Sequence, residues 1–516
     1  MTAPGNNAEA PYPTRILVAA ILGAALGFLG ASIVNVALPT FQTELGADAT
    51  DLQWIVSAYN LAIAALLLSA GAFSDRKGHL KIFRLGLVTC VGASVVCATA
   101  RDPSVLIIGR AFQGYASALL VPSSLGLVNN VYPAHARGYA VGLWSSFSAV
   151  GGGMGPIIGG FVIEFVSWRY MFWINVPIVL IVWWLLASQP YPAVERRPQN
   201  PFDWAGAIYS AAALGLLTIA SIESPSIGVF HPMILTLLTI AAVAGFLFIR
   251  TQQNSDAPLM PLSMFHSRNF AAANVVTFLA YCTIGGGFYV MMLTWIQIQG
   301  YSPLAAGAIT LPFMLFTGGF AHTVSNLVRR IGPKLPLSSG VALLGIGFVT
   351  FALPGIGTSF WIGYLPGVLL TALGIALLVA PVTTVVMGSV ELKQSGIASG
   401  INSAVARSAI LLSVAVLGAI HFAHFERIAT DALNKLALDP ELEIRMQAEL
   451  IKMAAAEIPG DTPKLVASAI HEVITGTFLQ ATRIVLLIAG ALSILGAIIA
   501  FIYIGRPDRE SLLDDG

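Results

Sequence analysis

Long apolar runs separated by short polar breaks fill most of the chain. Charge clusters, prolines and glycines divide it into apolar segments near 16–38, 52–73, 82–100, 104–130, 137–162, 169–188, 203–221, 232–250, 270–297, 303–327, 335–353, 359–388, 396–420 and 477–504. A helix of about 20 residues crosses the roughly 30 Å hydrocarbon core of a bilayer. Because lipid offers the backbone no hydrogen-bond partners, runs of this length are expected to be helical. The pattern predicts an all-α membrane protein with 14 transmembrane helices.

The composition agrees with this fold class. Hydrophobic residues make up 56% of the 516 positions, charged residues 10%, and the mean hydropathy is +0.81. A soluble protein carries roughly 25% charged residues, so we expect the lipid bilayer to surround this chain. The net charge of +1 and the lack of a polybasic tail argue against nucleic acid as a partner.

Basic residues predict the orientation of the spans, since Lys and Arg gather in short cytoplasmic loops. With the N-terminus in the cytoplasm, one set of loops holds most of them, whereas the opposite loops hold little beyond Arg101 and Arg169. We expect a monomer in the cytoplasmic (plasma or inner) membrane with both termini cytoplasmic. The basic loop residues are Arg76, Lys77, Lys81, Arg137, Arg196, Arg197, Arg268, Arg329, Arg330, Lys334 and Lys393.

The stretch GAFSDRKGHLK, residues 71–81, is the loop between spans two and three. A basic loop that only sets topology does not explain the acid Asp75 or the flanking Gly71 and Gly78. Glycine lets helix ends approach closely, and a carboxylate interacts favourably with a helix N-terminus. We expect a latch formed by Gly71, Asp75, Arg76 and Gly78, with an imperfect copy, VSNLVRRIGPK, after span ten.

The chain resembles the major facilitator superfamily, and within it the 14-span drug exporters of the EmrB/QacA type, over residues 16–505. The motifs that carry the resemblance are GAFSDRKGH, RAFQGYASALLVP from Arg110, GGGMGPIIGG at 151–160, IVNVALP at 33–39, WRYMFWINVPI at 168–178, GYSPLAAGAITLPF at 300–313 and GIASGINSAVARS from Gly396. It implies two six-helix bundles, 16–190 and 270–504, with two inserted helices within 191–269 and cytoplasmic tails at 1–15 and 505–516. It also implies proton-driven export of hydrophobic small molecules by alternating access, with no cofactor.

The resemblance assigns roles to individual residues. Arg110 and Arg407 lie inside apolar spans, where a lone arginine costs at least about 2.5–3.5 kcal/mol. The family links the fourth-span arginine, with Gln113, to substrate or proton coupling, and Arg407, which matches a family position in span thirteen, is expected to share this role. A structural arginine that binds carbonyl groups is the alternative for Arg110. The glycine-rich fifth span predicts a tight antiporter seam at Gly151, Gly155, Pro156, Gly159 and Gly160. Candidates for the substrate cavity are Ser32, Asn35, Tyr59, Asn60, Tyr281, Tyr289 and Gln297.

The sequence departs from the family at Gly30, where relatives usually carry an acid. No Asp or Glu lies clearly at mid-depth in any predicted span, although a buried carboxylate is the usual titrating group. Recognition of cationic drugs is therefore weakened, and Arg110 and Arg407 favour neutral or anionic substrates. Proton coupling then falls to Asp75 or to His322.

Residues 421–475 form the one sizeable loop, expected outside the membrane, with a helical stripe at Phe425, Ile428, Ala432 and Leu436. A lid, a contact for a periplasmic adaptor protein and a solvated cap are the three interpretations. For the chain as a whole, the alternatives are a receptor or scaffold that no longer cycles and an uncoupled transporter of neutral or anionic lipophiles. An enzyme is not expected, because the nearest catalytic or metal-binding candidates, His421 and His424, lack a third ligand.

Overall fold

The computed structural model describes residues 14–187, 202–255, 258–391, 394–436 and 438–505. Within these ranges the regular elements are helices, and no strand occurs. Thirteen helices are long and apolar enough to cross a membrane, and a pair bent by 53°, Pro303–Gly319 with Thr323–Ile331, supplies a fourteenth span. The predicted all-α fold with 14 spans is confirmed. The bend in span ten is a difference, because the sequence suggested one continuous helix there.

The first six spans pack together as one bundle. They are α1 (Thr14–Ser32), which continues through η1 (Ile33–Ala37) into α2 (Leu38–Leu45), followed by α3 (Ala49–Lys77), α4 (His79–Ala98), α5 (Pro103–Val131), α6 (Ala134–Phe165), and α7 (Tyr170–Trp173) with α8 (Asn175–Ala187). Contacts of α5 with α3 and α4, and of α1 with α5 and α6, hold the bundle together.

The last six spans form the second bundle. They are α11 (Arg268–Leu293) with the π-turn η3 (Thr294–Ile298), the bent span α12 (Pro303–Ala308), α13 (Leu311–Gly319) and α14 (Ala321–Ile331), then α15 (Lys334–Phe351), α17 (Leu365–Gly388), α18 (Ser395–Asn434) and α20 (Lys464–Tyr503). The short helices η2 (Leu262–His266) and α16 (Phe360–Gly363) precede α11 and α17. The inserted helices α9 (Trp204–Ile227) and α10 (Pro232–Asn254) pack on each other, and α9 contacts α3 and α18.

The acids near the span ends have a local role, which explains why they lie outside the apolar runs. Asp48, Asp102 and Asp203 are N-caps, whose carboxylates accept hydrogen bonds from backbone N–H groups in the first turns of α3, α5 and α9. Such caps satisfy donors that a helix start leaves unpaired.

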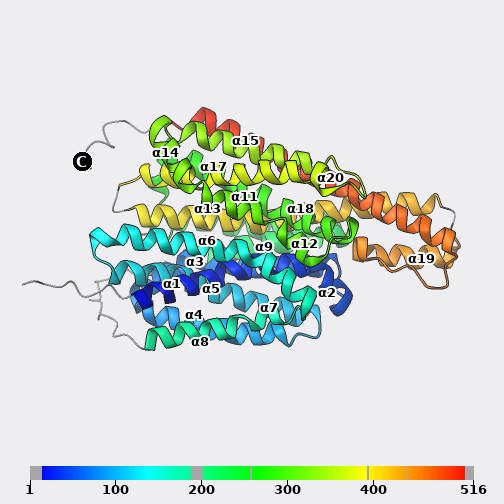
Figure 1. Ribbon diagram of the computed structural model, residues 1–516, viewed down its shortest axis with the longest axis horizontal. Coiled ribbons are helices and arrows are strands. Elements are labelled where there is room, and N and C mark those ends of the chain that lie inside the picture. Colours follow the sequence, from blue (N-terminus) through cyan, green and yellow to red (C-terminus); the bar gives the residue numbers. More distant parts are fainter. Residues whose placement is uncertain (1–13, 188–201, 256–257, 392–393, 437, 506–516) are drawn as a thin grey trace, which may run out of the picture.

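The two ends of the molecule, along the direction of the long helices, differ in shape (Figure 1). We call the end at which α1 begins and α20 finishes the terminal end. At the opposite end, α18, α19 (Pro440–Glu449), η5 (Leu450–Ala455) and α20 project as a helical hairpin, which we call the outer hairpin. The amphipathic stripe predicted there is partly wrong: Phe425, Ala429 and Leu433 are the fully buried positions, four residues apart, and Ile428 is only half-buried.

Candidate functional site

Arg110 lies inside the first bundle, with 1% of its surface exposed. Its Nε donates to the backbone oxygen of Ile55 at 3.2 Å, and its Nη1 donates to Oε1 of Gln113 at 2.9 Å. The guanidinium also lies over the ring of Tyr59, 4.2 Å from the centroid. The pairing of Arg110 with Gln113 fits the sequence. The arginine nevertheless donates to a backbone carbonyl group within its own bundle, which is the contact expected of the alternative, an arginine with a structural role.

The Arg110 network joins five spans through uncharged groups, because the hydroxyl of Tyr59 also bonds the backbone oxygen of Gly27 on α1. Gln113 donates to Oγ of Ser94 at 3.2 Å, and Asn175 on α8 donates to the same hydroxyl at 2.9 Å. The hydroxyl of Tyr59 donates to Oγ of Ser117 at 2.8 Å. Tyr59 is fully buried, so neither it nor Arg110 lines an open cavity in this state. The network acts as a polar core of the first bundle.

Gly30 packs against the ring that covers Arg110. A Cβ atom at Gly30 would lie 3.3 Å from the hydroxyl oxygen of Tyr59 and 3.4 Å from its ring. A larger side chain there would press on Tyr59, which would have to shift by a few tenths of an ångström. In this chain the hydroxyl and the ring edge of Tyr59 therefore lie against position 30.

Arg407 has different surroundings, at the interface of the two bundles. Its guanidinium lies over the ring of Phe28 on α1, 5.1 Å from the centroid, although Arg407 itself belongs to α18. Both residues are half-buried, as is Tyr281 on α11, the helix that packs against α18. Among the residues that the structure describes, Arg407 has no hydrogen-bond or ion-pair partner.

The glycines of α6 form a two-sided seam. Cβ atoms at Gly151, Gly155 and Gly159 would collide with Ala25, Ser32 and Ile33 of span one, and the hydroxyl of Ser32 donates to the backbone oxygen of Gly152 at 2.5 Å. On the other side, a Cβ at Gly160 would lie 2.7 Å from Cα of Leu304, in the second bundle.

Pro156 belongs to the side of the seam that faces the second bundle. A Cβ at Gly307 would lie 2.7 Å from its carbonyl carbon, so the two backbones touch. Close backbone packing of this kind requires small residues.

Polar contacts close the outer-hairpin end between the bundles. Glu164, at the end of α6, accepts a hydrogen bond from the backbone N–H of Leu304 at 3.2 Å. Gln297 donates to the amide oxygen of Gln42 at 2.5 Å, and Gln42 donates to the backbone oxygen of Lys452 in η5 at 2.9 Å. Gln297, a cavity candidate, thus lies in this closure. No motif in the sequence pointed to Gln42 or Glu164 as part of this closure.

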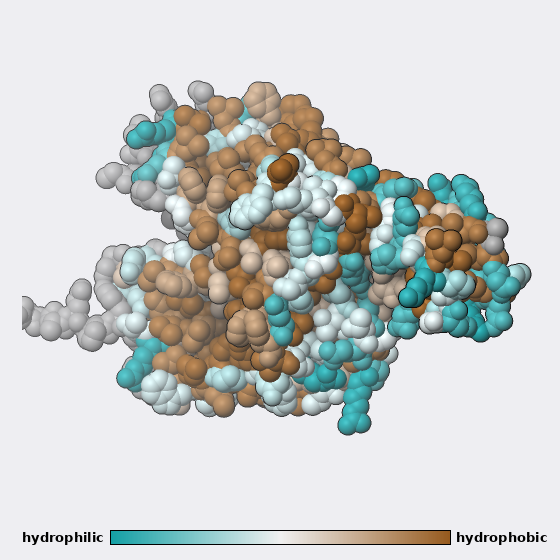
Figure 2. Space-filling model, turned by 45° about the vertical axis from the view of Figure 1, so that its right-hand side comes forward, coloured by the Kyte–Doolittle hydropathy of each residue, from teal (hydrophilic) through white to brown (hydrophobic). Residues whose placement is uncertain are grey.

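The terminal end is not closed in the same way. Figure 2 shows a notch between two apolar lobes on the side away from the outer hairpin. Towards this end, helices α3 and α18 are still in contact at Leu68 and Gly400. A Cβ atom built at Gly400 would lie 3.7 Å from Cδ2 of Leu68. On the other side of the interface, the contacts of α6 with the second bundle are made with α12 and α13, which form the first part of span ten. The molecule is joined at one end and notched at the other.

The loop predicted to be a latch, residues 71–81, makes contacts within its own turn and with the segment before α9. Asp75 lies 3.7 Å from Nε2 of His79, whose Nδ1 is 2.8 Å from the hydroxyl of Ser74. Arg76 lies 5.9 Å from the ring centroid of Phe202, just before α9. Gly78 has φ 93°, which favours glycine over other residues. Neither contact tests the predicted latch to the second bundle.

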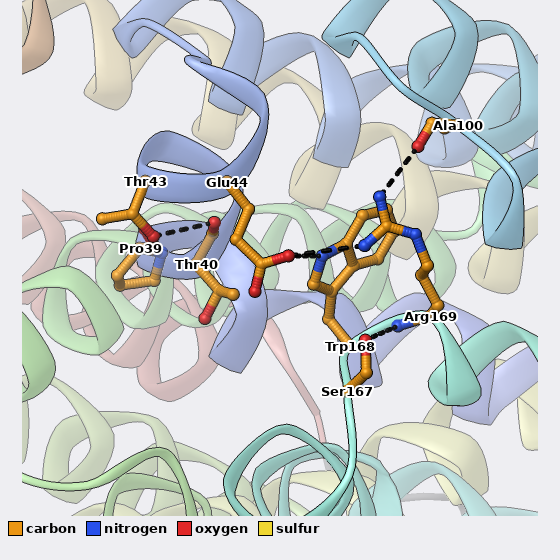
Figure 3. A network of polar contacts seen from close by, with 8 residues as sticks. All are labelled: Pro39, Thr40, Thr43, Glu44, Ala100, Ser167, Trp168 and Arg169. Carbon is orange, nitrogen blue, oxygen red and sulfur yellow. Dashed lines mark hydrogen bonds and ion pairs between the residues drawn. The ribbon is translucent and has the colours of Figure 1, made fainter.

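A carboxylate of α2 organises the outer-hairpin end of the first bundle (Figure 3). Glu44 accepts a hydrogen bond from the indole of Trp168 at 2.8 Å and pairs with Arg169 at 3.4 Å. Arg169 also donates to the backbone oxygen of Ala100 at 3.3 Å and stacks 4.3 Å above Trp168. This network ties spans one, three and six together and gives the WRY motif a structural role.

The remaining cavity candidates divide by burial. Asn60 and Tyr289 are 2% exposed, and the side chain of Asn60 donates to the backbone oxygen of Val56 at 3.0 Å. Both are therefore packed within their bundles. Ser32 and Asn35 are half-buried near the bundle interface. The side chain of His322 lies outside the described residues.

The fold and these contacts accord with the similarity of the chain to known proteins. The Major Facilitator Superfamily profile matches residues 20–414. "Multidrug resistance protein Stp" of Mycobacterium tuberculosis is 31% identical over 490 residues, 92% of this chain and 89% of its own. "Tetracenomycin C resistance and export protein" of Streptomyces glaucescens is 30% identical over 515 residues, 97% and 93%.

A solved structure supports the fold alone. A bacterial homolog of the human lysosomal transporter Spinster, in an inward-facing and unoccupied conformation, has a TM-score of 0.66 at 16% identity and covers 95% of this chain and 98% of its own. The profile match, the full-length relatives and the 14 spans agree. The chain belongs to the major facilitator superfamily, among its 14-span drug exporters.

Proposed function

We propose that this protein is a proton-driven antiporter that exports hydrophobic small molecules across the cytoplasmic membrane by alternating access. The observation that carries the proposal is the asymmetry between the two ends of the molecule. Backbone-to-backbone contacts at Gly160 and Gly307 join the bundles at the outer-hairpin end, and a notch separates them at the terminal end. Such a shape is one of the two states that a rocking transporter needs.

The direction of transport follows from the basic loops and the relatives. The Lys and Arg distribution favours a cytoplasmic terminal end, so the notch opens to the cytoplasm in this state. The relatives named for multidrug resistance and for tetracenomycin C resistance and export favour outward transport of drug molecules. The proton gradient is the proposed energy source.

Asp75 is the candidate for proton coupling. The acids in the described spans lie towards the span ends, and Asp75, beside His79, is at the terminal end of α3. A carboxylate at this place can gain or lose a proton as the cytoplasmic side opens and closes.

The test uses proteoliposomes that hold a pH-sensitive dye. We expect a lipophilic substrate to release protons in the wild type and Asp75→Asn to abolish this flux, whereas the matched control Asp431→Asn, on the outer hairpin, leaves it intact. Substrate movement without any proton flux in the wild type would show an uncoupled transporter. No movement of any tested compound by folded protein would favour a receptor or scaffold.

A further inference from the structure

We propose that Arg407, Phe28 and Tyr281 form a binding site for aromatic organic anions at the interface of the two bundles. This inference rests on the proposed function, because it names the substrate class that the exporter takes.

The three residues lie at the same depth. Phe28 is 14 residues from the start of α1, Tyr281 is 13 from the start of α11 and Arg407 is 12 from the start of α18, each at the terminal end. At 1.5 Å per residue these positions are about 18–21 Å from that end, near the middle of a hydrocarbon core roughly 30 Å thick. A substrate site shared by two bundles is expected at this depth.

The guanidinium of Arg407 is the unsatisfied group of this site. Arg110 has its hydrogen bonds met by Ile55 and Gln113 inside one bundle. Arg407 faces the ring of Phe28 and, among the described residues, has no hydrogen-bond or ion-pair partner. A charged group within a span that is not paired by protein marks a functional site by default. Its planar set of N–H donors matches a carboxylate or a similar oxyanion.

The surroundings select against cations. Among the described spans, the acids lie towards the ends: Glu44, Asp51, Asp75, Glu164, Glu223, Glu426, Asp431 and Glu472. The neighbouring polar groups are neutral, since Asn402, five residues from Arg407, donates to Thr277 at 2.8 Å and Asn274 at 3.2 Å. A lipophilic cation would meet the positive charge of Arg407 with no nearby acid to offset it.

The rings determine the rest of the ligand. Phe28 and Tyr281 come from different bundles and are both half-buried. Aromatic rings gain from stacking or edge contacts with another ring, and the guanidinium lies over the ring of Phe28, 5.1 Å from its centroid. The ligand that uses every group is a flat aromatic system bearing one anionic substituent.

The experiment is equilibrium binding to the full-length protein in detergent, which needs no proton gradient. The probes share one fluorescent ring: 9-anthracenecarboxylate, its neutral carboxamide and 9-(aminomethyl)anthracene. We expect the carboxylate to bind about tenfold tighter than the amide, as for one hydrogen bond to a charged group, and the amine to bind weakest. Arg407→Gln should remove the preference and leave amide binding unchanged, which also shows that the variant is folded. Arg250→Gln, an exposed arginine on α10, is the matched control.

Each outcome of the binding experiment either supports or overturns the proposed site. A preference for the carboxylate that disappears only in Arg407→Gln supports the site. Equal or tighter binding of the amine by the wild type overturns it, even if no variant folds. A preference that survives in Arg407→Gln also overturns it. Because binding is measured without transport, loss of proton coupling would refute the antiporter and leave this site standing.

Discussion

The seam between α6 and α12 can be tested by adding one branched side chain at Gly160. Substitution Gly160→Val places a Cβ 2.7 Å from Cα of Leu304, whereas ordinary contacts begin near 3.4 Å. The backbones must therefore separate by about 0.7 Å or more, and overpacking of this kind costs about 1–3 kcal/mol. Since the clash exists only where the bundles meet, the cost falls on the state that is closed at the outer-hairpin end. The equilibrium ratio of that state to the opposite state should drop by a factor of about 5 to 150.

The readout is alkylation of a cysteine placed at Gln53, which is 2% exposed and packs against Gly418. A membrane-impermeant maleimide added from the outer-hairpin side should label it faster in the Gly160→Val background. Gly142→Val, on the same helix but with no atom within 4 Å of its Cβ, keeps the helix-propensity change and removes the clash. Equal labelling in both backgrounds would refute the idea that backbone contact at Gly160 closes this end.

Further perturbations follow from the same contacts. Arg110→Met removes the donor to Gln113 and should cost about 1–3 kcal/mol of stability through unpaired buried groups, seen as a lower melting temperature in detergent; an unchanged value would argue against a polar core. Glu164→Gln weakens the hydrogen bond from Leu304 and should raise the same Gln53→Cys labelling less than Gly160→Val does. A hydrogen bond to Glu449 raises the pKa of Lys452. The contact between the two residues therefore stabilises the outer hairpin fully below the pKa that Lys452 has in the unfolded chain. This stabilisation is lost as the pH rises through the pKa of Lys452 in the folded protein. Hydrogen exchange in η5 should therefore increase above about pH 10.5, and in Lys452→Met this pH-dependent step should be absent.

The spans could be predicted from the sequence because hydrocarbon constrains length and polarity so strongly. Fourteen apolar runs gave 14 spans, and the glycines of α6 lie where close packing was expected. The length of an apolar run and the position of a glycine are both local properties of the chain, so one sequence is enough to predict their consequences.

The polar partners could not be predicted, since they depend on which spans meet. Nothing in the local sequence around Gln42 indicates that its amide joins Gln297 and Lys452, 255 and 410 residues away. The sequence pattern also did not distinguish Arg110 from Arg407, since each is a lone arginine within an apolar span. Only the packing shows that one is enclosed by Ile55 and Gln113 and the other lies between bundles.

The outer hairpin has a consequence for how the protein can be handled. Helices α18 and α20 have 40 residues each, about 60 Å at 1.5 Å per residue, twice the thickness of the hydrocarbon. Their surplus length forms a stalk with α19 alongside it, and Ile444 and Leu465 are exposed there. In a detergent micelle most of the protein is covered, and small antibodies have few places to attach. The stalk stands clear of that belt, so it offers a rigid, asymmetric landmark for a binding fragment and for aligning particle images.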